Sequence, residues 1–143
     1  MNDRTLIQKR RFTESNSDTW DWIITEKEKE MGRCRFTLEK DHMYIDDLVV
    51  QKEHRRKGIG SILLRAVEEH ATLLGLPEIR GSAVAYEKEV SNYREYLKSW
   101  WKKRGYCFRV YLPDDESRHV GNFHKELPQQ GGAINSKATA SPR

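Results

Sequence analysis

The longest regular pattern of apolar and polar positions lies in the middle of the chain. An apolar, β-branched stretch ends at Val50, a short basic turn with two glycines follows, and apolar residues then recur at helical spacing. The pattern predicts a strand over Met43–Val50 and a helix from about Gly58 to Leu74, closed by Gly75. The positions at helical spacing are Ile62, Leu63, Ala66, Val67, His70, Leu73 and Leu74.

Shorter patterns on both sides of this unit predict the other elements. Alternating apolar positions such as Trp20, Trp22 and Ile24 are typical of a strand, and the charged run 26–30 is typical of a solvated turn. A second helix is expected from about Ser91 to Arg104, ended by a glycine. The remaining expected strands are Thr5–Phe12, Trp20–Thr25, Met31–Glu39, Pro77–Val84, Tyr106–Leu112 and His119–Leu127.

The order β-β-β-β-α-β-α-β-β predicts a layered α/β or α+β fold with a mixed sheet and two helices. A chain of 143 residues corresponds to one domain by its length, and we assign residues 1–127 to it. Residues 128–143 are rich in Gly, Ser, Ala and Gln, with Ile134 as the one large apolar residue. This composition predicts a disordered tail.

Composition and charge narrow the functional classes. No apolar run approaches the roughly 18 residues of a membrane span, and residues 1–12 hold no secretory hydrophobic region. Cys34 and Cys107 have no partner at metal-ligand spacing, which predicts free, reduced core thiols in a cytoplasmic protein and no metal site. The net charge of +4 suits a polyanionic cofactor and gives only weak support for nucleic acid as a partner.

The basic turn after the central strand has the features of an anion site. Its glycines let the backbone bend sharply, and the first N–H groups of the following helix lack intrahelical partners. Arg55, Arg56 and Lys57 would add diffuse positive charge. A Walker loop needs Lys-Ser/Thr after Gly60, and a dinucleotide fingerprint needs glycine at Leu63, so neither pattern fits. The turn therefore predicts a pyrophosphate site of another kind.

Arg55-Arg56-Lys57-Gly58-Ile59-Gly60 resembles the Arg/Gln-x-x-Gly-x-Gly/Ala signature of the GNAT superfamily of N-acetyltransferases. In that family the loop holds the pyrophosphate of acetyl-CoA. The motif is embedded in Tyr-Ile-Asp-Asp-Leu-x-Val before it and Ser-Ile-Leu-Leu after it. The resemblance implies a GNAT-like fold, with a mixed, mostly antiparallel twisted sheet, and acetyl-CoA as the co-substrate.

The N-terminal region departs from the family pattern. Family members usually carry two helices between the first two strands, and only about residues 13–19 are available here. An abbreviated N-terminal helical region would leave one side of the sheet uncovered. Because exposed apolar patches tend to find partners, we expect a homodimer.

The same resemblance implies which residues bind the cofactor. The backbone of the central strand would contact the pantetheine, with the amide of Val50 donating to the thioester oxygen. Asn92 would contact the pantetheine and Arg104 a phosphate. The full expected set is Leu48, Val49, Val50, Arg55, Arg56, Lys57, Gly58, Ile59, Gly60, Ser61, Asn92, Trp101 and Arg104.

Two acids in the central strand are the candidate catalytic residues. Their context is similar to Tyr-(Ile/Leu)-Glu-Asp-(Leu/Phe)-x-Val of the diamine acetyltransferase branch, in which the first acid is implicated in deprotonating the amine. Carried over, Asp46 is the candidate base, acting through water, and Asp47 is a second acceptor contact. Adjacent strand residues point to opposite faces, so at least one acid should face a cleft. The alternative is that both acids pair with Arg or Lys of a neighbouring strand.

The general acid of the expected site departs from the family pattern. The stretch from Trp100 to Tyr106 resembles Phe-Tyr-x-x-x-Gly-Phe, whose tyrosine is the family's proposed acid, and Trp101 stands in its place. An indole cannot deliver a proton at neutral pH. Another residue, such as Tyr96 or Tyr106, could act instead, or the thiolate could leave unassisted.

The expected function is acetyl-CoA-dependent N-acetyl transfer to a primary amine, either a small cationic amine or a lysine side chain. The alternative is a non-catalytic GNAT-like module or sensor that binds acyl-CoA.

Overall fold

The computed structural model describes residues 4–11, 18–84, 93–110 and 119–129. Within them lie seven strands, two α-helices and a short 3-10 turn at Lys52–His54. The described bounds agree with the predicted ones to within two residues. The elements are β1 (Arg4–Arg11), β2 (Thr19–Glu26), β3 (Lys29–Leu38), β4 (Met43–Val50), α1 (Ile59–Leu73), β5 (Glu78–Val84), α2 (Tyr93–Lys103), β6 (Cys107–Val110) and β7 (His119–Glu126).

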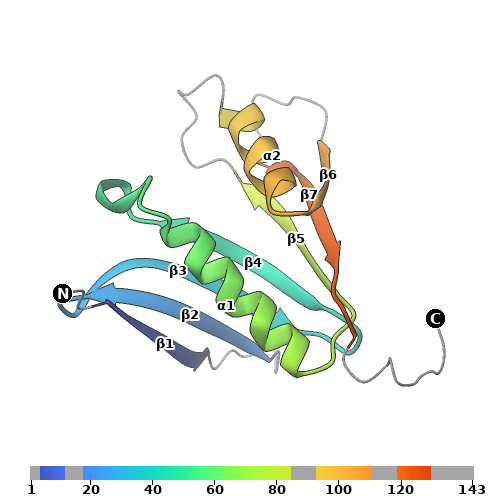
Figure 1. The fold of residues 1–143 in the computed structure, drawn as a ribbon, viewed down its shortest axis with the longest axis horizontal. Helices are drawn as coiled ribbons and strands as arrows, with labels where there is room; N and C mark the ends of the chain where they lie inside the picture. The colour runs from blue at the N-terminus through green and yellow to red at the C-terminus, as the bar shows by residue number, and fades with distance from the viewer. Residues whose placement is uncertain (1–3, 12–17, 85–92, 111–118, 130–143) are drawn as a thin grey trace.

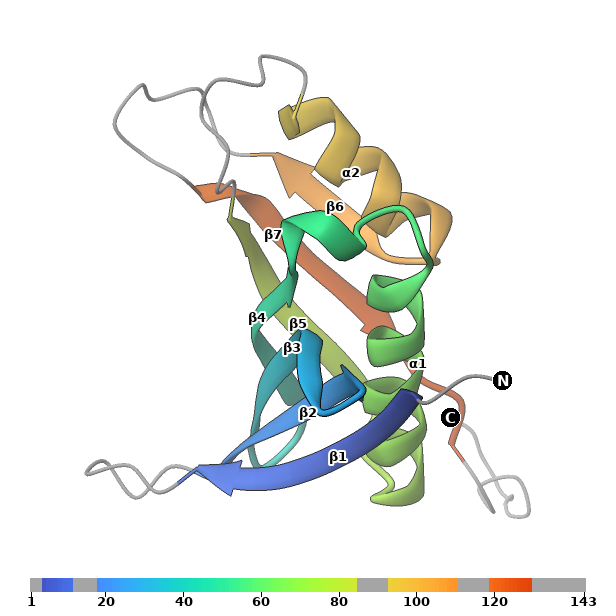
Figure 2. The same cartoon turned by 90° about the vertical axis from the view of Figure 1, so that its left-hand side faces the viewer.

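All strands belong to one sheet in the order β1-β2-β3-β4-β5-β7-β6. Neighbouring strands are antiparallel except β4 and β5, which are parallel and are joined through α1. Both helices lie on the same face, with α1 against β2 to β5 and α2 against β6 and β7 (Figures 1 and 2). The predicted mixed, mostly antiparallel sheet is therefore confirmed, and only residues 12–18 join β1 to β2.

The sheet opens in its middle. β4 and β5 pair only where Met43–Ile45 meets Ile79–Gly81, and beyond this point the two strands diverge (Figure 1). The register between β3 and β4 shifts at the same place, because Asp47 lies opposite Arg35 whereas Ile45 lies opposite Phe36. Asp46 is thus the extra residue of a β-bulge, a feature that bends a strand and redirects its side chains.

Helix α1 fills the space behind this opening. Its buried residues lie on one side of the helix and are Ile59, Leu63, Leu64, Ala66, Val67 and Ala71. Leu73, predicted among the apolar positions at helical spacing, is the last residue of α1 and is 76% exposed. Leu74, at the end of the helix, is 50% exposed as well. The sheet side of this core includes Met31, Cys34, Phe36, Met43, Ile45, Ile79, Val120 and Phe123.

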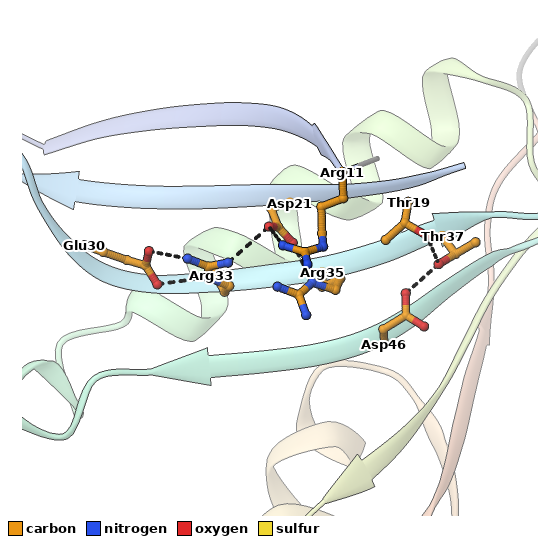
Figure 3. A network of polar contacts seen from close by, with 8 residues as sticks. All are labelled: Arg11, Thr19, Asp21, Glu30, Arg33, Arg35, Thr37 and Asp46. Carbon is orange, nitrogen blue, oxygen red and sulfur yellow. Dashed lines mark hydrogen bonds and ion pairs between the residues drawn. The ribbon is translucent and has the colours of Figure 1, made fainter. Parts of the chain in front are cut away.

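No helix of the described chain covers the other face of the sheet (Figure 2). Its β2–β3 part carries ion pairs between Asp21 and the arginines Arg11, Arg33 and Arg35, as Figure 3 shows. The homodimer was predicted from an uncovered apolar surface at this place. At β2–β3 this face carries the charged groups, whereas β1 adds Ile7, 40% exposed and opposite Ile23, so the homodimer stays a prediction.

Three further sequence predictions concern the cysteines, the C-terminal tail and membrane spans. Both cysteines are free, and burial raises the pKa of the Cys34 thiol, but Cys107 is exposed rather than in the core as predicted. Of the predicted tail 128–143, residues 130–143 lie outside the described residues. No helix in the described part of the chain is long and apolar enough to cross a membrane.

Candidate active site

A cleft of about 600 Å³ occupies the opening between β4 and β5. Its walls come from the second half of β4, the turn after it, the first residues of α1, the end of β5, one face of α2 and one residue of β7. The lining residues are Ile45, Asp47, Leu48, Val49, Val50, Arg55, Arg56, Gly58, Ile59, Gly60, Ser61, Ser82, Ala83, Tyr96, Leu97, Trp100, Trp101, Arg104 and Phe123.

The N-terminus of α1 forms one end of the cleft. The hydrogen bond from the Ile62 N–H to the Gly58 carbonyl, 3.1 Å long, is the first of the helix, so the N–H groups of Ile59, Gly60 and Ser61 precede it. No side chain caps this end. Uncapped amides with the positive end of the helix dipole are suited to hold a phosphate or pyrophosphate.

Two left-handed backbone positions shape the turn before this helix end. Arg56 has φ 67° and Gly58 has φ 77°, which glycine adopts without strain and arginine does not. The Arg55 guanidinium donates through Nε to the Val50 carbonyl at 3.2 Å, which fixes it beside the end of β4. Of the three predicted basic residues, Arg55 and Arg56 line the cleft, whereas Lys57 is exposed and does not.

Arg104 joins α2 to the same helix end. Its Nε and Nη2 donate to the Ser61 hydroxyl at 3.1 and 2.8 Å, and its Nη1 donates to the Trp100 carbonyl at 2.8 Å. The guanidinium also lies 3.8 Å above the Trp100 ring. This arrangement holds a positive charge beside the amides of α1, where the sequence predicts a phosphate contact.

Gly60 lies at the close approach of α2 to α1. A Cβ atom at this position would lie 3.1 Å from Cζ2 of Trp100 and 3.7 Å from Cγ2 of Val50. A side chain at residue 60 would therefore point into the cleft, between two of its lining residues. The glycine leaves this space open at the anion-binding end.

The backbone of β4 forms a wall with unused hydrogen-bonding groups. The Gln51 N–H donates to the Met31 carbonyl of β3 at 2.8 Å. Because backbone groups alternate between the two neighbours of a strand, the N–H groups of Val50 and Leu48 point away from β3, toward the cleft. The backbone of Val49 is directed to β3, which favours Leu48 and Val50 over Val49 as donors to a ligand.

The bulge places both acids on the same face of the sheet, contrary to the expectation of opposite faces. The Thr37 hydroxyl donates to Asp46 Oδ2 at 2.6 Å, and Asp47 lies directly opposite Arg35 in the neighbouring strand. Thr37 and Arg35 are two residues apart in β3, so their side chains share the face turned away from α1 (Figure 3). Asp47 lines the cleft, whereas Asp46 lies just outside it on the open face.

Asp46 sits in surroundings that favour its protonated form more than water does. Burial of its inner side against the sheet is the largest cause and raises its pKa above the ordinary value. The hydrogen bond from Thr37 and the charge of Arg35 act in the opposite direction. No ion pair to Asp46 is found among the described residues. The expected alternative, pairing with a basic residue of the next strand, therefore does not account for Asp46.

Aromatic residues close the side of the cleft opposite β4. Trp101 is buried, with its ring stacked on Phe123 at 3.7 Å and edge-on to Tyr106 at 5.0 Å. The Tyr106 hydroxyl donates to Glu68 at 2.7 Å, and burial raises its pKa further above the ordinary value. Tyr106, the other candidate acid, does not line the cleft. Tyr96, 55% exposed, does line it.

Most of the cofactor-binding residues predicted from the sequence thus meet in one cleft. Asn92 is outside the described residues, and Lys57 does not line the cleft. Sequence reasoning missed residues from β5 and β7, because only the divergence of the strands brings them to β4. Ser82, the one residue with a polar side chain in the second half of β5, is the one that could have drawn notice. The missed lining residues are Ile45, Ser82, Ala83, Leu97, Trp100 and Phe123.

The profile of the Acetyltransferase (GNAT) family matches residues 3–96, more than half of the chain. The chain belongs to this family. Members of the family are acetyltransferases, and acetyl-CoA is the co-substrate that goes with this membership. The cleft fits such a molecule, with uncapped amides for a pyrophosphate at one end and a free β4 edge along its length.

Comparison with individual proteins agrees with this assignment. An L-ornithine N5-acetyltransferase of Arabidopsis thaliana is 32% identical over 60 residues, which cover 42% of this chain and 26% of that protein. The chain therefore spans about a quarter of the length of this curated relative.

Solved structures share the fold. An acetyltransferase of the GNAT family from Staphylococcus aureus Mu50 has a TM-score of 0.62 and 15% identity, covering 80% of this chain and 71% of that one. The PaiA N-acetyltransferase of Thermoplasma acidophilum, in complex with coenzyme A, has a TM-score of 0.59 and 21% identity, covering 79% and 64%. A protein of Lactobacillus plantarum has a TM-score of 0.65 and 18% identity, covering 89% and 100%. At these identities the likeness concerns the fold.

Proposed function

We propose that this chain catalyses acetyl transfer from acetyl-CoA to a primary amine in the β4–β5 cleft. The observation that carries the proposal is the arrangement of the cleft along β4. An uncapped helix end with arginines lies at one end, and two carboxylates lie together where the cleft opens to the uncovered face. A polyanionic donor and a cationic acceptor would therefore enter from different sides.

The bound cofactor would supply the acetyl group, which passes to the amine nitrogen as the CoA thiol is released. The chain's own part begins at α1, where the amides of Ile59, Gly60 and Ser61 would hold the pyrophosphate with Arg55 and Arg104 beside them. The Val50 N–H would donate to the thioester oxygen and stabilise the negative charge that develops there.

The two acids would have different roles at the acceptor side. Asp47, on the cleft wall, would hold the cationic amine by charge. Asp46, outside the wall, would take the amine proton through a water molecule, which a base with a raised pKa does more readily. The Thr37 hydroxyl orients the Asp46 carboxylate for this task.

Tyr96 is our candidate for the acid that protonates the leaving thiolate. Its hydroxyl is a proton donor, and the residue lines the cleft from α2, next to Trp100 and Leu97. Trp101 cannot take this role and would act only as a wall. Its replacement of the family tyrosine is also the observation that favours the second candidate function, an acyl-CoA-binding module without turnover.

The acceptor class follows from the acids and from the curated relative. The carboxylates suit a small cationic amine or a lysine side chain, and the Arabidopsis relative is by its name an enzyme of L-ornithine. A primary amine with a short, flexible chain would reach both acids.

A thiol-release assay tests the proposal. Acetyl-CoA and the protein are incubated with L-ornithine, putrescine, spermidine and a lysine peptide, and mass spectrometry identifies acetylated product. We expect CoA release that depends on one or more of the amines, with a stoichiometric N-acetyl product. Binding of acetyl-CoA without release for any amine would establish the module instead.

A further inference from the structure

The charge cluster on the uncovered face is not needed to bind acetyl-CoA or to hold an amine. At its centre lies Asp21, only 3% exposed, which contacts three arginines. Asp21 Oδ1 accepts from Arg35 Nε at 3.0 Å, and Oδ2 lies 3.1 Å from Arg33 Nη1 and 3.6 Å from Arg11 Nη1. Figure 3 shows these groups on the same side of the sheet as Asp46.

The arginines of this cluster differ in the hydrogen-bonding capacity that remains to them. Arg33 is occupied on three nitrogens, because it also donates to both oxygens of Glu30, at 2.9 and 2.6 Å. Arg35 uses Nε for Asp21, and in the described part of the chain its two terminal nitrogens donate to no other group. Its side chain is 30% exposed. Arg35 is therefore held in place at one edge and open at the other.

The position of Arg35 relative to the acids is fixed by the sheet. It lies directly opposite Asp47, so the two side chains leave neighbouring strands on the same face. Its charge acts on Asp46, where it partly offsets the rise in pKa that burial causes. One small molecule could therefore place its carboxylate at Arg35 and its amine, a few bonds away, at Asp46 and Asp47.

The contact with Asp21 already restricts the Arg35 side chain, so binding a ligand would cost little further conformational entropy. An arginine that is ordered in the free protein loses little conformational freedom when it binds, and its terminal nitrogens can bind a carboxylate with charge-assisted hydrogen bonds. Asp21 and Glu30 offset two of the three guanidinium charges, and the amine of a bound acceptor would offset the charges of Asp46 and Asp47 beside them.

We propose that the acceptor is a zwitterion: its amine is held at Asp46 and Asp47, and its carboxylate is bound by the terminal nitrogens of Arg35. This inference rests on the proposed acetyl transfer and narrows its acceptor to amino-acid-type amines. Arg35 is a specificity residue here, and Asp21 positions it.

Matched acceptors test the idea on the unaltered protein. L-ornithine and putrescine, and likewise L-lysine and cadaverine, differ by one carboxylate. The acids alone would favour the diamines, which carry the higher positive charge. We expect kcat/KM to be higher for each amino acid than for its decarboxylated partner. Equal or higher values for the diamines would overturn the proposal, while no turnover with any amine would instead contradict the proposed function.

Arg35→Gln tests the residue itself. We expect kcat/KM for L-ornithine relative to putrescine to fall about 10- to 100-fold, the effect of losing a hydrogen bond between charged groups. The fall should appear in KM. This ratio does not depend on the fraction of folded protein, so partial loss of stability cannot imitate it. Arg65→Gln, which removes an exposed arginine from α1, should leave the ratio unchanged.

Arg35→Lys provides a second variant that keeps a positive charge beside Asp21. A lysine cannot present two donors in the arginine geometry, so an intermediate ratio is expected. An unchanged ratio in a folded Arg35→Gln or Arg35→Lys protein would overturn the assignment of Arg35.

Discussion

Asp46 is both a structural irregularity of β4 and the proposed catalytic base. It is the extra residue of the β4 bulge, and Thr37 holds it on the open face. Asp46→Asn keeps its size and removes its basicity, so kcat/KM should fall about 100-fold at neutral pH. The loss should shrink at high pH, where free amine is abundant. A pH–rate profile with one active amine measures both effects.

The same variant makes a prediction about stability. A carboxyl whose pKa is raised by folding binds its proton more tightly in the folded state, so ionisation lowers stability as pH rises through that pKa. At neutral pH, Asp46→Asn should therefore be no less stable than wild type in urea denaturation. If the Asp46→Asn protein were as fast as wild type but clearly less stable, Asp46 would have a structural role and would not be the base.

Tyr96 and Trp101 form a matched pair on α2. Tyr96→Phe removes only the hydroxyl proposed to protonate the thiolate, so kcat should fall about tenfold or more if proton delivery limits the rate. Trp101→Phe should change kcat little, because no proton passes through the indole, although its packing on Phe123 makes some loss of stability expected. Single-turnover rates with a common amine compare them. A larger loss of rate for Trp101→Phe than for Tyr96→Phe would give Trp101 a functional role and would exclude Tyr96 as the acid.

For single residues, the sequence predicted which residues lie close together more accurately than it predicted the directions of their side chains. The motif around Gly58 and Gly60 predicted a helix end with free amides, because glycine spacing fixes that geometry locally. The orientation of Asp46 and Asp47 was not predictable from alternation. A bulge depends on how two strands pair, and its presence cannot be read from one strand.

The β2–β3 hairpin is the element whose turn is least suited to its residues. Lys27 and Glu28 form a two-residue turn with φ 53° and 70°, the left-handed region that type I′ turns require. Each such residue costs about 1 kcal/mol relative to glycine. Replacing the pair by Asn-Gly should raise the free energy of unfolding by about 1 kcal/mol, with an unchanged m value in urea.

Alanine at the same two positions serves as the control for this hairpin. It removes the same pair of opposite charges but keeps the strained backbone, so no stabilisation is expected. If the alanine pair stabilises as much as Asn-Gly, the effect comes from the side chains, and the strain argument fails.

Elements were predictable from the sequence where their pattern is local. The stripe of α1 and the alternation of β2 to β4 follow from 3.6- and 2-residue periods. The β4–β5 divergence and the Asp21–arginine cluster were not predicted, because each depends on which strands become neighbours. The polar face of β3 shows the limit: Arg33 and Arg35 have the spacing of an ordinary solvated face, and only the register brings them to Asp21.

On the scale of the whole molecule, the opening of one sheet creates the site. β1 to β4 with α1 form one arm and β5 to β7 with α2 the other, and the cleft lies where the arms separate (Figure 1). A homodimer and a cytoplasmic location stay predictions. Light scattering at high micromolar concentration checks the first, and a monomer would contradict it.

The central claim is that the end of this cleft at α1 binds the pyrophosphate of acetyl-CoA. Gly60→Asn and Gly60→Asp add side chains of one shape that point into the cleft toward Trp100 and differ in charge. A negative charge in the first turn of a helix stabilises the helix, so weaker binding by Gly60→Asp than by Gly60→Asn could not be explained by poorer folding.

Calorimetric titration of acetyl-CoA into wild type and both variants is the most direct measurement. We expect wild type to bind, Gly60→Asn to bind more weakly because its side chain meets Trp100, and Gly60→Asp to bind at least a further tenfold more weakly, about 1.4 kcal/mol. Equal affinities of the two folded variants, or no binding by wild type, would contradict the account.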